Sequence, residues 1–222
     1  MRRVDRVVVV LAKWPGGGRA KRRLSRDIGA AAATPLARSF LGDTLELTAR
    51  GGAERVLVAY APPAARARFA RLAPAATLVA QPRGSFGRRL ESGLRAGLAV
   101  GRHVLLIGAD SPTLPPRTLR AGFTRLATAD AVLGPAEDGG FYLLGTRVHL
   151  PGSLFRRMPW STPAVAAETL ARASAAGIDM ALLPRWYDVD NAVSLRRLLG
   201  DRAGLARARS TRAALVDLGI LR

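Results

Sequence analysis

Glycines and basic residues crowd one short stretch near the start of the chain. It reads VVVVLAKWPGGGRAKRRLSRD over residues 7–27, and it holds the only two lysines of a chain with 35 lysines and arginines in all. Its notable residues are Lys13, Gly16, Gly17, Gly18, Arg19, Lys21, Arg22 and Arg23. Backbone N–H groups and positive charge before a helix favour phosphate binding, and cations this crowded repel one another unless an anion lies among them. A flexible turn would explain the glycines equally well, because the spacing matches neither a Walker A motif nor the G-x-G-x-x-G fingerprint.

The use of lysine at two of these positions is informative. Arginine supplies every other side-chain cation apart from the histidines, whereas Lys13 and Lys21 carry compact ammonium groups. A compact point charge fits between phosphate oxygens in a way that the planar fork of arginine does not. Chance clustering of two residues is the alternative interpretation. By contrast, Arg38 is predicted to lie on an outer helix surface, where lysine should replace it without effect.

Carboxylates follow several of the apolar runs. Asp110 ends such a run in HVLLIGADSPTLP. It could hold a divalent ion that bridges phosphates, since Mg²⁺ takes one or two protein carboxylates together with phosphate oxygens. Alternatively, it could cap the Asp-Ser-Pro turn.

Three polar residues, Asp188, Asp190 and Asn191, lie together in WYDVDNA near the end of the chain. One of them suffices for a helix N-cap. The stretch therefore also offers a second metal-binding carboxylate.

A further acidic pair precedes a Gly-Gly turn in AEDGGFYLLG. Structurally, this pattern is a hairpin signal. Functionally, Asp138 could act as a base or hold an acceptor hydroxyl. The sequence leaves both interpretations open.

Strands and helices alternate along the chain. Short apolar runs predict strands over residues 4–12, 55–61, 77–80, 103–109, 131–134, 141–145 and 178–183. Helical spacing predicts helices over residues 21–27, 34–50, 63–72, 86–100, 115–127, 163–176, 192–199 and 203–218. This order is typical of an α/β protein with a mostly parallel sheet, and we expect one domain over residues 1–222. Ligands bind beyond the carboxyl ends of the strands in such sheets, where the basic stretch and the aspartates fall.

The composition excludes several other classes of function. The net charge of +19 could favour nucleic acid, but no aromatic residues interleave with a basic stripe, so we expect no nucleic-acid partner. The absence of cysteine excludes disulfides and thiolate metal sites, and we interpret His103 and His149 as structural. No segment is long enough to span a bilayer, and the first apolar run is too short for a signal peptide. We therefore expect a cytoplasmic protein with no membrane partner, while the oligomeric state stays open.

The motifs together resemble those of DUF2064, a family of small bacterial proteins. AKWPGGGRAKRRL is similar to the family's loop K-x-P-x-x-G-x-x-K-T-R-L, and GADSPTLP, LGPAEDGGFYLLG, PWSTPAVAAETL and DVDNAVSL follow in the family's order. Members are labelled GT-A-type glycosyltransferases, and the wider superfamily includes 2-phospholactate and molybdenum-cofactor guanylyltransferases. The resemblance spans nearly the whole chain. It implies a GT-A, Rossmann-like, mostly parallel sheet flanked by helices.

The resemblance and the residue types together assign roles to individual residues. The first loop would bind nucleotide phosphates, and Asp110 and Asp190 would hold Mg²⁺ or Mn²⁺. The candidate catalytic residues are Lys13, Lys21, Arg23 and Asp138. The candidate nucleotide-binding residues are Gly16, Gly17, Gly18, Arg19, Arg22, Ser85 and Gly108.

Departures from the family's pattern bear on the substrate. Arg22 stands where the family has a threonine, and Asn191 also replaces a threonine in the late motif. The family's G-D-L-G-E-R-L reads GSFGRRL over residues 84–90, so Ser85 replaces an acid and Arg88 replaces a glutamate. If the replaced acid touches the base or the acceptor, this chain accepts a different substrate from typical members.

These observations favour a Mg²⁺-dependent nucleotidyltransferase. A small phosphorylated acceptor would attack the α-phosphate of a nucleoside triphosphate and release pyrophosphate. Phosphoryl transfer depends on positioning and electrostatics, which suits a site of cations and aspartates. One alternative is a GT-A glycosyltransferase that uses a nucleotide sugar, although the basic loop is richer than a diphosphate requires. Another is a non-catalytic nucleotide- or RNA-binding module, which would bind without turnover.

Overall fold

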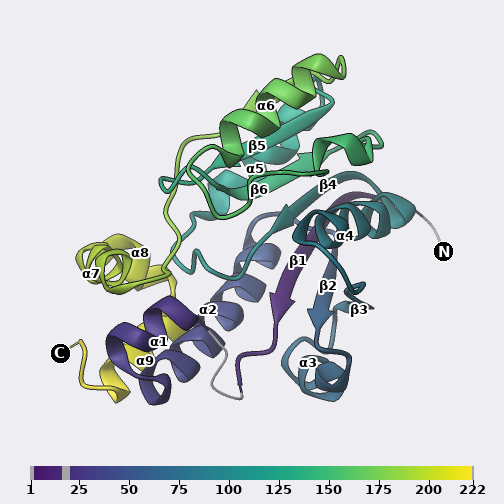
Figure 1. Cartoon of the computed structure of the whole chain (residues 1–222). Coiled ribbons are helices and arrows are strands. Elements are labelled where there is room, and N and C mark those ends of the chain that lie inside the picture. The colour runs from purple at the N-terminus through teal and green to yellow at the C-terminus, as the bar shows by residue number, and fades with distance from the viewer. Residues whose placement is uncertain (1–2, 17–20, 222) are drawn as a thin grey trace.

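A seven-stranded sheet forms the centre of the computed structural model, which describes residues 3–16 and 21–221 (Figure 1). The strands are β1 (Val4–Lys13), β2 (Arg55–Ala61), β3 (Thr77–Ala80), β4 (Gly101–Ile107), β5 (Ala131–Pro135), β6 (Phe141–Thr146) and β7 (Met180–Leu182). Their order is β3-β2-β1-β4-β6-β5-β7. Strand β6 is antiparallel to β4 and β5, and the other pairs are parallel. The predicted α/β fold with a mostly parallel sheet is confirmed.

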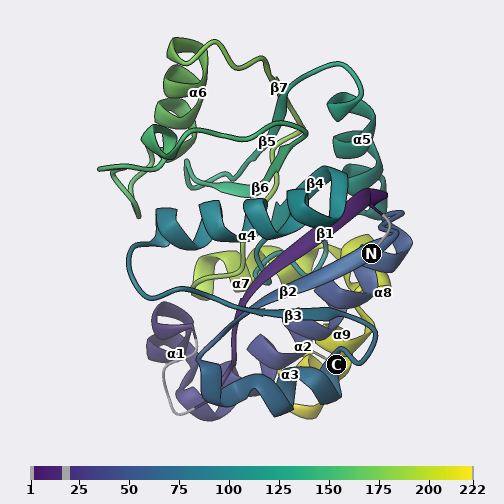
Figure 2. The same cartoon turned by 90° about the vertical axis from the view of Figure 1, so that its right-hand side faces the viewer.

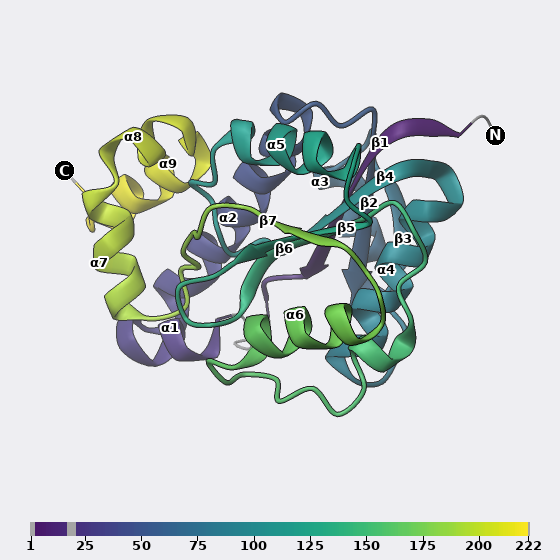
Figure 3. The same ribbon diagram turned by 90° about the horizontal axis from the view of Figure 1, so that it is seen from above.

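Helices cover both faces of the sheet because its central strand is apolar on both sides. In β1, Val8 and Val10 pack with side chains of α2 (Ala30–Arg50), α3 (Arg66–Leu72) and α5 (Pro116–Leu126). Val7 and Val9 point the other way and pack under α4 (Phe86–Val100). Helix α4 runs along β1 and β4 (Figure 2), and α6 (Val165–Ala175) covers the same face (Figure 3). A continuous apolar run covered in this way is typical of parallel strands.

A group of helices lies beside the sheet and forms a third core with part of α2 (Figure 1). The group consists of α1 (Arg22–Ile28), α7 (Ala192–Gly200), α8 (Arg202–Arg207) and α9 (Arg209–Asp217). Leu24 of α1 and Leu195 of α7 are both buried in this core. The core therefore brings α1, which follows β1, against the last three helices of the chain, next to the carboxyl edge of the sheet.

The predicted helix over residues 203–218 is wrong, because the structure has two helices there, α8 and α9. The backbone breaks at Ala208, with φ −88° and ψ 71°. Asp43 of α2 accepts hydrogen bonds from the backbone N–H groups of Ser210 and Thr211, at 2.9 and 2.8 Å. A buried carboxylate from another helix therefore satisfies the first turn of α9, and the local sequence pattern does not show it.

Two other predicted helices differ at their starts. The helix expected over residues 34–50 begins at Ala30 and contains Pro35. Four successive alanines precede Thr34 and favour helix, which offsets the one backbone hydrogen bond that a proline removes. The helix expected over residues 63–72 begins as a 3₁₀ turn, Pro63–Ala65, before α3. A second 3₁₀ turn, Gly152–Leu154, follows β6.

Among the described residues, no helix is both long enough and apolar enough to cross a membrane.

Candidate active site

A pocket of about 1040 Å³ lies at the carboxyl ends of β1, β2 and β4. This is the edge where ligands bind in open α/β sheets. The pocket walls include the start of α4, the start of β6 and the segment before α7. Seven of the residues proposed from the sequence line it: Lys13, Gly16, Lys21, Arg22, Gly108, Asp110 and Asp190.

The other candidates are not among the described residues that line the pocket. Gly17, Gly18 and Arg19 fall outside the described residues. Arg23 is exposed on α1, outside the described lining of the pocket. Ser85 caps α4 by accepting a hydrogen bond from the Arg88 backbone N–H at 3.3 Å.

The predicted base, Asp138, closes the turn between β5 and β6. Its Oδ1 atom accepts a hydrogen bond from the backbone N–H of Gly140 at 2.9 Å. The side chain is exposed and is not among the described residues that line the pocket. The hairpin interpretation therefore accounts for this aspartate, and its catalytic role stays a prediction that its position does not support.

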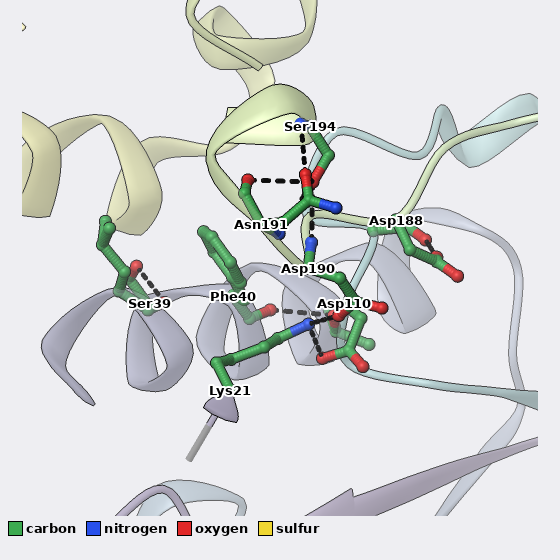
Figure 4. A network of polar contacts seen from close by, with 11 residues as sticks. Lys21, Ser39, Phe40, Asp110, Asp188, Asp190, Asn191 and Ser194 are labelled. Atoms are coloured by element: carbon green, nitrogen blue, oxygen red, sulfur yellow. Dashed lines mark hydrogen bonds and ion pairs between the residues drawn. The ribbon is translucent and has the colours of Figure 1, made fainter. Parts of the chain in front are cut away.

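Lys21 lies at the centre of the acidic part of the pocket (Figure 4). Its Nζ atom is 2.6 Å from Oδ1 of Asp110 and 2.7 Å from Oδ1 of Asp190. The lysine side chain is only 8% exposed, whereas the two aspartate side chains are 49% and 39% exposed. The ammonium group therefore fills the space behind the carboxylates, and the carboxylates face the pocket.

The backbone of Lys21 is also unusual. Its φ of 48° and ψ of 58° place it in the left-handed region, directly before α1. A residue other than glycine costs on the order of 1–3 kcal/mol there, and such residues cluster at functional sites. The conformation starts α1 while directing the side chain toward the aspartates. The lysine side chain, rather than the backbone conformation, therefore explains why residue 21 is not a glycine.

The charges around Lys21 decide its protonation. Burial alone lowers the pKa of Lys21, but the carboxylates of Asp110 and Asp190 raise it further than burial lowers it. The pKa is therefore above the ordinary lysine value, and the ammonium stays charged. Its charge also holds the two carboxylates close together, because they would otherwise repel each other.

Asp188 adds a third carboxylate to this part of the pocket, and the sequence motif gave it no separate role. The Ser111 hydroxyl donates a short hydrogen bond to its Oδ1 atom. Burial raises the pKa of Asp188 to about 7, an effect that the Ser111 bond opposes and the nearby Asp110 reinforces. The spacing of Asp188 and Asp190 in DVD could have indicated that both belong to the site, because residues two apart in an extended segment lie on the same side.

Hydrogen bonds join the loop after β4 to the segment before α7. The backbone N–H of Val189 donates to the Asp110 carbonyl at 2.8 Å. The Thr113 hydroxyl donates to the Tyr187 hydroxyl at 2.7 Å, and Tyr187 donates to Asp201 at 2.9 Å. These bonds fix the two acid-bearing loops relative to each other.

The start of α7 fixes Asp190 from the other side. Asn191 and Ser194 form a reciprocal capping box, and the Asp190 backbone N–H donates to the Ser194 hydroxyl at 2.8 Å. Both functions suggested for WYDVDNA are therefore present, but on different residues. Asn191 caps the helix, and Asp190 points its carboxylate at Lys21.

Gln81 is a pocket residue that the sequence did not single out. Its Nε2 atom donates to the carbonyl oxygens of Ala12 at 3.0 Å and Ala59 at 2.6 Å. Because both amide hydrogens are used, the carboxamide orientation is fixed and Oε1 is left as an acceptor. The contacts place this residue over β1 and β2. A lone glutamine after a short strand carries no sequence signal for such a role.

The residues present fit a hard divalent cation. The carboxylates of Asp110 and Asp190 both line the pocket and stay partly exposed beside Lys21. No three His, Cys, Asp or Glu side chains of the described chain group closely enough to form a metal site by themselves. Mg²⁺ does not require such a cage, because it keeps waters and substrate phosphates among its ligands.

The sequence and the fold both match known proteins. A family model described as an uncharacterized protein conserved in bacteria (DUF2064) matches residues 44–162, over half of the chain. No curated protein matches significantly. A protein of Desulfovibrio desulfuricans G20, provisionally named a nucleotide-diphospho-sugar transferase, shares 27% identity at a TM-score of 0.87. The match covers 95% of this chain and 94% of that one.

Two more distant structures share the fold. Rv0371c of Mycobacterium tuberculosis H37Rv, solved in complex with manganese, has 17% identity and a TM-score of 0.55 over 88% of this chain and 99% of its own. A CMP:2-keto-3-deoxy-manno-octonic acid synthetase, solved with CTP, has 16% identity and a TM-score of 0.54 over 91% of this chain and 99% of its own. At these identities the likeness concerns the fold alone.

Proposed function

The chain belongs to the DUF2064 family, and from this premise we propose that it is a divalent-metal-dependent nucleotidyltransferase. It would join a nucleoside triphosphate to a small phosphorylated acceptor and release pyrophosphate. The observation that carries the proposal is the Lys21 ammonium between Asp110 and Asp190, in a pocket that Lys13 and Arg22 also line. The coarser class, a nucleotide-dependent transferase, agrees with the name of the D. desulfuricans protein, which matches nearly end to end.

Asp110 and Asp190 would hold Mg²⁺ or Mn²⁺ through their carboxylates, which line the pocket. When bound, such an ion neutralises phosphate oxygens and stabilises the charge that develops during transfer. The manganese in the Rv0371c structure supports a divalent ion on this fold. The chemistry of the donor set supports it independently, because carboxylates are the ligands that hard cations prefer.

The basic residues would bind and orient the triphosphate. Lys13 is exposed at the end of β1 and lines the pocket, as does Arg22 in the first turn of α1. Preorganised cations stabilise developing negative charge without reorganisation during the reaction. Lys21 would position the two aspartates and complete this charge distribution. Oε1 of Gln81 would accept a hydrogen bond from the base, because its amide hydrogens are already used.

The second candidate function is glycosyl transfer from a nucleotide sugar. The name of the D. desulfuricans protein favours it. The same aspartates would then hold the ion on a diphosphate, and the same basic residues would stabilise the leaving nucleoside diphosphate. The two functions share a site and differ in which bond breaks.

Product analysis separates these possibilities. The full chain would be incubated with each nucleoside triphosphate, or with nucleotide sugars, together with Mg²⁺ or Mn²⁺ and a mixture of phosphorylated small molecules. The proposal predicts pyrophosphate release from a triphosphate that depends on both metal and acceptor. Nucleoside diphosphate release from a nucleotide sugar would favour glycosyl transfer instead. Tight binding without any product would indicate a non-catalytic module.

We further propose that residues 1–222 act as one domain, with a nucleotide and a small acceptor as ligands. The continuity of the sheet supports this, because the pairing of β1 with β4 joins the early strands β1–β3 to the later strands β4–β7.

A further inference from the structure

The pocket extends across the sheet from β2 to β6, and its two ends differ in chemistry. At one end, Gln81 is bonded to main-chain oxygens of β1 and β2. At the other end, Phe141 at the start of β6 and Phe86 of α4 form the wall. Strand β4, which leads to Asp110, lies between them in the order β2-β1-β4-β6. Asp110 therefore lies between an end that holds Gln81 and Trp14 and an end whose wall is Phe86 and Phe141, which we call the aromatic end.

Phe86 and Phe141 line the second end of the pocket, and a third ring, Trp160, packs against both of them. Phe86 and Trp160 meet edge to face, with ring centroids 4.9 Å apart and planes at 88°. Phe141 lies 6.4 Å from Trp160 at 69°. Phe86 is 40% exposed, so part of its ring remains open to a ligand. These residues come from three separate segments of the chain.

The wall is held in place by close packing and by a strained turn. A Cβ on Gly87 would lie 2.7 Å from the Cβ of Phe155, so the first turn of α4 touches the segment that carries Trp160. Ser161, directly after Trp160, has a φ of 65°. A non-glycine residue in this region is strained and persists where the surroundings fix it. The indole itself packs beside Phe86, and its Cζ2 atom would lie 3.4 Å from a Cβ on Gly87.

Arg89 adds a positive charge to this end of the pocket. Its side chain lines the pocket, and one guanidinium nitrogen donates to the Gly84 carbonyl at 2.9 Å. The remaining donors of the fork can bind an anionic group, for which a guanidinium is well suited. The aromatic end thus offers a ring face and a cation together.

We infer that the aromatic end is the acceptor subsite, and that it takes an acceptor with a flat ring and a nearby anionic group. The ring would stack on Phe86, and the anionic group would pair with Arg89. The inference rests on the proposed function, in which nucleotide and acceptor meet at the metal-binding carboxylates. Phe86 presents the exposed ring face of this wall. An aromatic ring and a sugar ring both have such faces, and the experiment distinguishes them.

The test is a calorimetric titration of the full chain with three phosphorylated probes, both with and without a nucleoside triphosphate and Mg²⁺. The probes are phenyl phosphate, glucose 1-phosphate and glycerol 3-phosphate, which has no ring. At least one ringed probe should bind about tenfold tighter than glycerol 3-phosphate. Phe86→Leu should reduce that ratio about three- to tenfold, the usual worth of one aromatic contact, and Phe86→Tyr should preserve it. The tighter of the two ringed probes identifies the kind of ring.

Two further variants sharpen the test. Arg89→Gln should weaken all three probes by a similar factor, because it removes the partner of the shared phosphate. Leu182→Ala, at a residue 51% exposed on β7 and outside the described lining of the pocket, should change nothing.

Several results would overturn the inference. Equal affinity for all three probes, or an unchanged ratio in Phe86→Leu, would show that no ring is recognised. Weaker triphosphate binding in Phe86→Leu with unchanged probe binding would place the base, not the acceptor, on the aromatic wall. Failure of the wild-type chain to bind any triphosphate contradicts the proposed function instead, and the probe titrations without nucleotide still decide the inference.

Discussion

The acidic part of the pocket and its aromatic wall are built by different interactions. Hydrogen bonds and ion pairs between distant segments hold the acidic part, as when Lys21 meets Asp190 169 residues away. Ring packing holds the wall of Phe86, Phe141 and Trp160. Breaking a buried polar contact leaves its partner unsatisfied, whereas exchange of one apolar side chain for another is tolerated. Substitutions in the acidic part should therefore affect catalysis and local order together, and those in the wall should affect selectivity.

Asp110→Asn should have the largest effect. The substitution is nearly isosteric, so the fold should persist, but it removes a charge that the metal requires and one partner of Lys21. We expect turnover to fall about 10³-fold, as for other strong electrostatic contacts to a transition state. The measurement is kcat at limiting Mg²⁺. Asp179→Asn, at an exposed residue outside the described pocket lining, is the matched control. Near-wild-type turnover in Asp110→Asn would contradict the metal assignment.

Lys21→Arg should come next, although it preserves the charge. The ammonium lies within 2.7 Å of both carboxylates in a nearly closed space, which a longer planar guanidinium does not fit. We expect kcat/KM to fall about 10²-fold.

The control for Lys21→Arg is Arg125→Lys, at an exposed residue of α5. Arg38, expected from the sequence to tolerate lysine, is unsuitable. Its Nε atom donates to the Pro15 carbonyl at 3.3 Å, and its guanidinium lies 5.8 Å from the ring centre of Trp14. If Lys21→Arg behaved like Arg125→Lys, the lysine would be an ordinary cation of the loop.

Asp188→Asn should produce a smaller effect that depends on pH. Burial raises the pKa of Asp188 from 3.8 to about 7, so the folded metal-free chain binds this proton more tightly than the unfolded chain does. The stabilisation is complete below pH 4 and is lost as pH rises through 7. The variant should therefore gain stability relative to wild type between pH 5 and pH 8, on the order of 1–3 kcal/mol. Ser111 can still donate to the new amide oxygen.

Thermal unfolding of wild type and Asp188→Asn at pH 5 and at pH 8 measures this difference in stability. Added Mg²⁺ should shrink it, because a nearby cation favours the ionised carboxylate. A difference that is the same at both pH values would mean that Asp188 titrates normally.

Ser85→Asp with Arg88→Glu, which restores the family's acids, should have the smallest effect. Aspartate caps a helix as well as serine does, and neither residue belongs to the described lining of the pocket. We expect affinities for nucleotide and acceptor within about threefold of wild type, measured by calorimetry, because surface changes of this kind are nearly neutral. A tenfold change in preference would show that the start of α4 reaches the substrate through these two side chains.

Local patterns predicted the elements that depend on local sequence. The bounds of β2, β3 and α4 agree with the expected 55–61, 77–80 and 86–100, because turn residues and apolar periodicity define them. The break before α9 could not be predicted in this way, since it depends on the Asp43 carboxylate from α2.

The candidate site, too, could be predicted only where local motifs define it. Motifs at strand ends indicated Asp110 and Asp190, which the structure brings to one ammonium group. The motifs did not indicate that the ammonium group of Lys21 lies between these aspartates, because the sequence led us to expect that Lys21 contacts phosphate. The aromatic wall was also missed, because Phe86, Phe141 and Trp160 meet only through the tertiary fold and each reads locally as an ordinary apolar residue.

Calorimetric titration of a nucleoside triphosphate into wild type and Asp110→Asn, with and without Mn²⁺, tests the central claim most directly. The account predicts that wild type binds the triphosphate at least about tenfold tighter with Mn²⁺ than without it, and tighter than the matching diphosphate. Asp110→Asn should bind weakly and without regard to the metal. Wild-type affinity that ignores Mn²⁺, or full metal dependence in Asp110→Asn, would contradict the account.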